Sequence, residues 1–137
     1  MDPKYKMLDC LILGDSIAVG THQQRPECVA YAKGGWNTWQ WNRDYLKNNL
    51  SAKTVIISLG SNDHSGVRTK AELQRIREKI GVAKVFWILP SIKPHIQSHV
   101  REIAEQYSDT VLPFTPSSDK IHPTTSGYRE LAKATKQ

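Results

Sequence analysis

The 137-residue sequence contains few cysteines and no long apolar run. Its two cysteines, Cys10 and Cys28, are too few for a disulfide framework, and both lie in apolar stretches. They could lie on neighbouring strands, but no sequence feature requires a bridge, so we expect two buried free thiols. No apolar run approaches the roughly 20 residues of a membrane helix. Residues 1–6 lack the apolar region of a signal peptide, so a cytoplasmic location is the default expectation.

The sequence also lacks a run of consecutive lysines or arginines, although 19 Lys+Arg against 13 Asp+Glu give a net charge of +6. No motif of a nucleic-acid-binding domain is visible, so nucleic acid is a weak candidate as a partner. The positive charge fits either an ordinary solvated surface or attraction to an anionic glycan such as a cell-wall polymer. Without repeats or linkers, the chain is expected to form one domain over residues 1–137.

Short apolar runs alternate with segments of helical periodicity. We expect strands at 8–13, 28–32, 54–59, 83–89 and 110–114, and helices at 38–49, 70–80, 94–107 and 126–136. This alternation predicts an α/β fold, a three-layer α/β/α sandwich around a five-stranded parallel sheet. The expected strand order is 2-1-3-4-5. It places the first and third strands side by side at the point where ligands bind in such sheets.

Polar residues follow both of these strands. The first apolar run ends at Gly14-Asp15-Ser16 and the third at Gly60-Ser61-Asn62-Asp63, while Asp119 and His122 lie three residues apart near the end of the chain. Each motif taken alone is more often a turn or a helix cap. Together they supply a hydroxyl, a base for it and a carboxylate to orient the base, which nucleophilic catalysis requires.

These blocks resemble those of the SGNH (GDSL-like) hydrolase family. That family has a Gly-Asp-Ser turn, a glycine, Gly-x-Asn-Asp and Asp-x-x-His in this order, and here the resemblance spans residues 8–122, with Gly34-Gly35 after the second strand. It implies a flavodoxin-like sandwich and a serine hydrolase. The chain is short for this family, so few loops should cover the site.

The resemblance also assigns roles to residues. Ser16 would be the nucleophile, His122 the base and Asp119 the residue that orients His122. The oxyanion donors would be the backbone N–H groups of Ser16 and Gly35 and the side-chain amide of Asn62. Whether Gly34 or Gly35 donates stays open.

Three of the four tryptophans lie in residues 35–41, directly after the glycine pair. Trp36 is the best candidate for a residue that contacts a sugar or acyl group. At least one of Trp39 and Trp41 is expected to pack its helix onto the sheet. His64, two residues after Asn62, is a second candidate for substrate binding.

No metal or cofactor site is predicted, because His95 and His99 are four residues apart on a helix without a third ligand. The sequence therefore predicts a serine esterase that hydrolyses small acyl esters, acetyl esters in particular, on a carbohydrate. Two alternatives stay open. One is a hydrolase of lipid or thioester acyl groups, and the other is a non-catalytic flavodoxin-like module that holds phosphate at a helix N-terminus.

Overall fold

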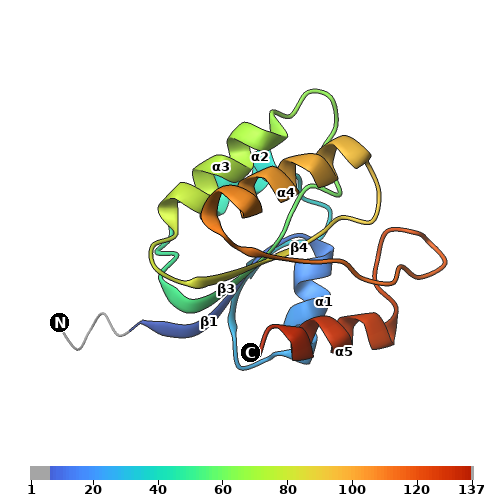
Figure 1. Ribbon diagram of the computed structural model, residues 1–137, viewed down its shortest axis with the longest axis horizontal. Helices are drawn as coiled ribbons and strands as arrows, with labels where there is room; N and C mark the ends of the chain where they lie inside the picture. The colour runs from blue at the N-terminus through green and yellow to red at the C-terminus, as the bar shows by residue number, and fades with distance from the viewer. Residues whose placement is uncertain (1–6, 137) are drawn as a thin grey trace.

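The computed structural model describes residues 7–136 of the chain, which form a five-stranded parallel sheet between two layers of helices (Figure 1). The strand order is β2-β1-β3-β4-β5, as predicted. The strands are β1 (Leu8–Gly14), β2 (Val29–Ala32), β3 (Ala52–Ser58), β4 (Lys84–Ile88) and β5 (Thr110–Leu112). The helices are α1 (Ser16–Gln24), α2 (Thr38–Tyr45), α3 (Thr69–Lys79), α4 (Pro94–Tyr107) and α5 (Thr125–Ala134).

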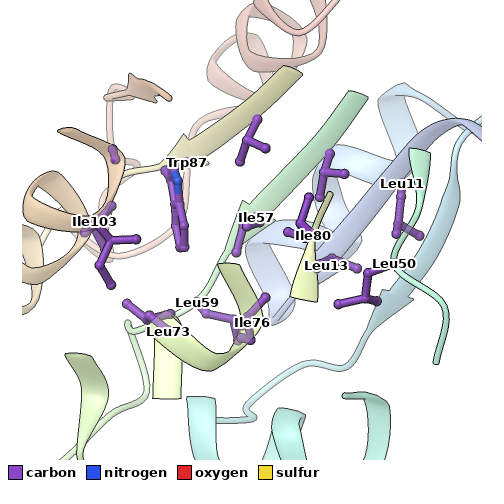
Figure 2. Close-up of a cluster of buried hydrophobic side chains, with 14 of the residues drawn as sticks. Leu11, Leu13, Leu50, Ile57, Leu59, Leu73, Ile76, Ile80, Trp87 and Ile103 are labelled. Carbon is purple, nitrogen blue, oxygen red and sulfur yellow. The ribbon is translucent and has the colours of Figure 1, made fainter. Parts of the chain in front are cut away.

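Each face of the sheet has its own apolar core. Leu11 and Leu13 of β1 point to the face covered by α2, α3 and α4, where Trp87 and Ile103 also lie (Figure 2). Ile12 points to the opposite face, which α1 and α5 cover. Alternate residues of one strand thus fill two cores, which explains why the strands are apolar almost throughout. Within residues 7–136, no helix is long and apolar enough to cross a membrane.

The helix predictions need one correction. Helix α1 was not predicted, because Ile17, Val19 and Gly20 are weak helix formers. Two adjacent parallel strands nevertheless need a crossover, and α1 provides it between β1 and β2. Trp41 is fully buried and packs α2 onto the sheet as expected, whereas Trp39 is exposed.

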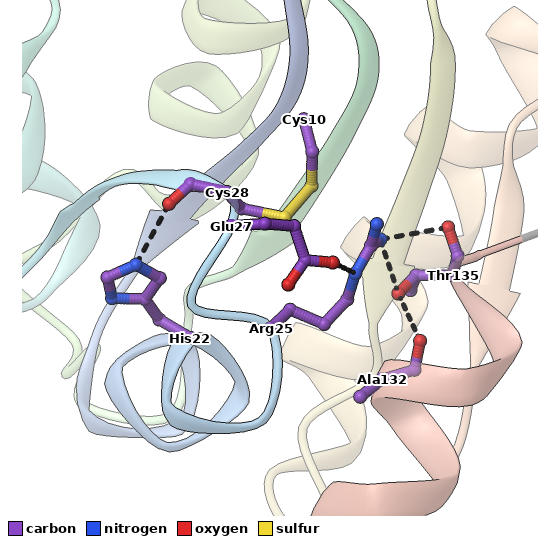
Figure 3. The surroundings of a disulfide bond; sticks show 7 residues. All are labelled: Cys10, His22, Arg25, Glu27, Cys28, Ala132 and Thr135. Carbon is purple, nitrogen blue, oxygen red and sulfur yellow. Dashed lines mark hydrogen bonds and ion pairs between the residues drawn. A yellow bond between two sulfur atoms is a disulfide. The ribbon is translucent and has the colours of Figure 1, made fainter.

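The prediction of free cysteines is wrong. Leu11 of β1 pairs with Val29 of β2, so the preceding residues, Cys10 and Cys28, face each other across the two strands. Both are buried, as expected, but they form a disulfide (Figure 3). The register between the strands determines this contact, and the sequence does not reveal that register. The bridge ties the edge strand β2 to the centre of the sheet.

We predict that this disulfide stabilises the fold by about 3 kcal/mol, because it closes a loop with a sequence separation of 18 residues. Urea unfolding of the wild type with and without dithiothreitol measures the effect. A Cys10→Ala/Cys28→Ala variant is the control, and reductant should leave its unfolding unchanged. If reductant does not alter the wild-type curve either, the two thiols are free in solution.

Candidate active site

The site lies at the carboxyl edge of the sheet, where β1 and β3 end next to each other. Gly14 allows this close approach, since a Cβ on residue 14 would lie 1.9 Å from the Ser58 carbonyl oxygen. Asp15 follows, and its backbone N–H donates to that same carbonyl at 3.0 Å. The Asp15 carboxylate then caps α1 by accepting from Ile17 N at 3.0 Å. Ser16 is therefore the first residue of a helix that starts at a fixed point of the sheet.

Ser16, His122 and Asp119 form an unbroken chain of hydrogen bonds. Ser16 Oγ lies 2.8 Å from His122 Nε2, and His122 Nδ1 lies 2.7 Å from Asp119 Oδ2. An ionised carboxylate only accepts hydrogen bonds, so Nδ1 carries the proton and Nε2 of the neutral ring accepts from the serine hydroxyl. The side chains of His122 and Asp119 are 39% and 48% exposed, so this chain opens directly to solvent.

The loop between β5 and α5 builds the Asp119–His122 pair. Asp119 Oδ1 accepts from the backbone N–H groups of Ile121 at 2.8 Å and His122 at 2.9 Å. The Ser117 hydroxyl donates to the same oxygen, and Ser117 N donates to His122 O at 2.7 Å, which closes the loop. These donors, the His122 N–H foremost, hold the pKa of Asp119 far below its usual value. Asp119 is therefore a carboxylate throughout the physiological range.

The predicted oxyanion donors lie at the start of α1 and on two loops, one after β2 and one after β3. Gly34 packs against Ser16, since a Cβ on residue 34 would lie 3.7 Å from the Ser16 Cβ. Gly35 has a φ of +80° in a turn that Trp36 N closes onto Lys33 O, and glycine adopts this conformation readily. Asn62 Nδ2 donates to Trp36 O at 3.0 Å. An amide nitrogen has two hydrogens, so a second N–H of Asn62 is left for a ligand.

Asp63 organises these loops, a role that the sequence analysis missed. Its buried carboxylate accepts from Thr38 N at 2.9 Å and Thr38 Oγ1 at 2.7 Å, at the start of α2. It also accepts from Thr69 Oγ1 at 2.6 Å, at the start of α3. One carboxylate thus joins two helices to the loop that carries Asn62. In the sequence, the only indication of this role is Asp63 itself, the last residue of Gly60-Ser61-Asn62-Asp63.

Lys93 supports the same loop from the other side. Its ammonium donates to Ser61 O at 2.8 Å and to Asp63 O at 2.7 Å. Lys93 has a φ of +62°, a conformation that few residues other than glycine adopt, directly before α4. The backbone on both sides of Asn62 is therefore held by one cation, which restricts where the Asn62 amide can lie.

Asp15 is buried beside Ser16 in an environment unlike that of Asp119. Ser58 Oγ donates to its Oδ1 at 3.3 Å, whereas Oδ2 has no hydrogen-bond partner among residues 7–136. Burial raises the pKa of Asp15 to about 6, although the N–H of Ile17 opposes the shift. The group closest in sequence to Ser16 is therefore an acid that ionises with difficulty.

The two predicted substrate-binding residues lie on different loops, Trp36 between β2 and α2 and His64 between β3 and α3. Trp36 is partly exposed, and its ring carries two cations, Lys33 Nζ at 4.9 Å and the Arg43 guanidinium at 5.5 Å from the ring centre. His64 is exposed and lines a cavity between α3 and α4. Its Nδ1 accepts from Gly66 N at 3.0 Å.

No family model matches the chain, and no curated protein matches it in sequence. Solved structures match its fold at low identity. A candidate acylhydrolase from Bacteroides fragilis is 18% identical with a TM-score of 0.66, covering 95% of this chain and 88% of its own. The catalytic domain of peptidoglycan O-acetyltransferase A from Streptococcus pneumoniae is 18% identical, with a TM-score of 0.67 and coverage of 93% and 89%.

A third match is the acetyl xylan esterase Est2A from Butyrivibrio proteoclasticus. It is 11% identical with a TM-score of 0.57, and the alignment covers 93% of this chain and 62% of the esterase. The chain therefore has the fold of SGNH-like hydrolases, as the sequence motifs suggested.

We predict that Asp15 makes stability fall as pH rises. Its pKa in the folded state lies about two units above that of a solvated aspartate, so between about pH 4 and 6 the folded state retains a proton that the unfolded state releases. The resulting loss is about 3 kcal/mol. The side chain of residue 15 in the Asp15→Asn variant cannot titrate. The free energy of unfolding of the variant minus that of the wild type should therefore rise by that amount from pH 4 to pH 7, as measured by urea unfolding.

Asp44→Asn is the control for this measurement. Arg43 lowers the pKa of the exposed Asp44, so removing that carboxylate should give a small change of the opposite sign. An Asp15→Asn protein whose stability runs parallel to the wild type from pH 4 to 7 would contradict the raised pKa.

Proposed function

We propose that the protein is a serine esterase that hydrolyses small acyl esters, in particular acetyl esters of a carbohydrate. The observation that carries the proposal is the chain of hydrogen bonds from Ser16 through His122 to Asp119 at the carboxyl edge of the sheet. A module that only binds phosphate at the N-terminus of α1 would have no use for the Asp119–His122 pair.

In the proposed reaction, Ser16 Oγ attacks the ester carbonyl carbon while His122 Nε2 takes its proton. The tetrahedral intermediate collapses, the bond to the alcohol oxygen breaks, and His122 returns the proton to that oxygen. Water then attacks the acyl-serine with His122 again as the base, which releases the acid and restores Ser16. Asp119 keeps the proton on Nδ1 and stabilises the imidazolium that forms in each step.

The developing oxyanion would be held by the N–H groups of Ser16 and Gly35 and by the Asn62 amide. Such donors act most strongly when they are fixed before charge develops. The bonds from Asn62 to Trp36 O and from Lys93 to both neighbours of Asn62 supply this fixation. We therefore assign Asn62 the donor role and Asp63 and Lys93 the role of positioning it.

Three features support an acetylated glycan over a lipid as the substrate. The Asp119–His122 pair is open to solvent, and Trp36 has a partly exposed ring with the cations of Lys33 and Arg43 over it. Two of the structural neighbours are named for peptidoglycan and xylan. The disulfide argues against the cytoplasmic default, since such bonds persist in oxidising compartments, where cell-wall polymers are found.

An acyl-serine can also pass its acyl group to a sugar hydroxyl instead of water. The match to a peptidoglycan O-acetyltransferase favours this as a second candidate reaction. Both reactions share the first half, so an assay must follow released acetate and acetylated acceptor separately.

We predict that the protein cleaves p-nitrophenyl acetate and acetylated xylan with higher kcat/KM than p-nitrophenyl octanoate. Ser16→Ala should reduce kcat by on the order of 10⁶ and abolish labelling by a fluorophosphonate probe. Unchanged circular dichroism and melting temperature would establish that the variant is folded. Turnover above a tenth of wild type in Ser16→Ala would remove Ser16 from the mechanism, and a strong preference for octanoate would favour a lipid substrate.

Asn62→Ala separates catalysis from loop structure. Loss of an oxyanion donor should lower kcat by roughly 10²–10³, about 2.7–4 kcal/mol, with little change in KM. A residue that served only the turn would affect mainly the melting temperature. We therefore expect kcat to fall while KM and the melting temperature stay close to wild type, all three measured on one preparation. A normal kcat in the folded variant would rule out the donor role.

A further inference from the structure

A cavity of about 690 Å³ lies between the first turns of α3 and α4, outside the chain of Ser16, His122 and Asp119. Its size falls within the roughly 300–1,000 Å³ of typical ligand pockets. Five side chains that carry or can acquire positive charge line it: His64, Arg68, Lys70, His95 and His99. Val67 and Ala71 supply apolar wall between them.

The wall of this cavity continues into the proposed oxyanion loop. Thr69 lines the cavity and donates to the Asp63 carboxylate at 2.6 Å, and His64 lies two residues after Asn62. Lys93, directly before α4, bonds the backbone on both sides of Asn62. The cavity therefore adjoins the loop that carries Asn62.

Of the two permanent cations that line the cavity, Arg68 and Lys70, only Lys70 has an acidic partner in the described part of the chain. None of its lining residues is acidic, and Arg68 makes no ion pair with any residue in 7–136. Lys70 pairs with Glu102 of α4 at 2.6 Å, and this contact lowers the pKa of Glu102. The nearby His99 lowers the pKa of Glu102 further. The Nδ1 atom of His99 is buried without a hydrogen-bond partner among the described residues.

We propose that this cavity is a subsite for a negatively charged substituent, a carboxylate or a phosphate, on a sugar of the glycan substrate. Arg68 and the imidazoles of His95 and His99 hold the anion, while Val67 and Ala71 contact the sugar ring. This assignment rests on the proposed function for its substrate, but anion binding itself does not depend on catalysis. It also gives the net charge of +6 a local role.

Calorimetric titration of the wild type with sodium tetragalacturonate, glucose 6-phosphate and neutral cellotetraose tests the subsite. We expect at least one of the two anions to bind, more weakly at higher salt, and cellotetraose not to bind detectably. The anion that binds identifies the substituent. Arg68→Gln should raise its Kd at least about tenfold, because a charge-assisted hydrogen bond is lost, and His95→Gln/His99→Gln should raise it as well.

Arg129→Gln is the matched control, since Arg129 is exposed on α5 at the opposite face of the sheet and loses the same charge. If neither anion binds, if cellotetraose binds as tightly, or if Arg129→Gln weakens binding as much as Arg68→Gln, the subsite is overturned.

Kinetics on a matched pair of substrates then link the subsite to turnover. Acetylated xylo-oligosaccharides with a glucuronic acid branch should be cleaved with higher kcat/KM than unbranched ones, and Arg68→Gln should reduce that preference. The two proposals fail separately. Ester cleavage without anion binding removes the subsite alone, whereas anion binding that depends on Arg68, in a protein that cleaves no ester, removes the esterase alone.

Discussion

The close contact between β1 and β3 at Gly14 and Ser58 sets the geometry of the whole candidate site. Without a side chain at residue 14, the Ser58 carbonyl can accept from Asp15 N, and this fixes where α1 begins. Ser16 is the first residue of that helix, so its hydroxyl position follows from the strand contact. The loops that carry Asn62 and His122 have to converge on this point, and their polar contacts serve that purpose.

The two carboxylates near Ser16, Asp119 and Asp15, have opposite environments, which shift their pKa values in opposite directions. Asp119 receives several N–H donors in an exposed loop, which favours its charged form. Asp15 is buried against β3 and one of its oxygens has no partner in the described part of the chain, which favours its neutral form. Asp119 contacts His122 Nδ1, whereas Asp15 accepts from Ile17 N, so one carboxylate is placed to orient the histidine and the other caps α1.

The sequence was sufficient to predict the strand order and the convergence of Ser16, His122 and Asp119. The apolar runs mark the strands, and the position of each motif relative to these runs can be read directly from the sequence. It was insufficient for features set by contacts between distant segments. The Cys10–Cys28 bridge depends on the β1–β2 register, and α1 depends on the need for a crossover more than on its own weak helix formers. The contacts of Asp63 with Thr38 and Thr69 likewise exist only once α2 and α3 are in place, so the motif predicted the position of Asn62 but not the role of Asp63.

The fold is stabilised and the site is positioned by different kinds of interaction. Apolar side chains on both faces hold the sheet. The disulfide ties the edge strand β2 to β1, and the bonds from Arg25 to Thr135 join the end of α1 to the end of α5 (Figure 3). At the carboxyl edge, the loops are held instead by hydrogen bonds to the buried Asp63 carboxylate and from the partly buried Lys93 ammonium. Such bonds have strict geometry, whereas apolar packing tolerates small shifts. Hydrogen bonds of this kind restrict where the Asn62 amide can lie, while the cavity between α3 and α4 beside the same loop remains unfilled by side chains.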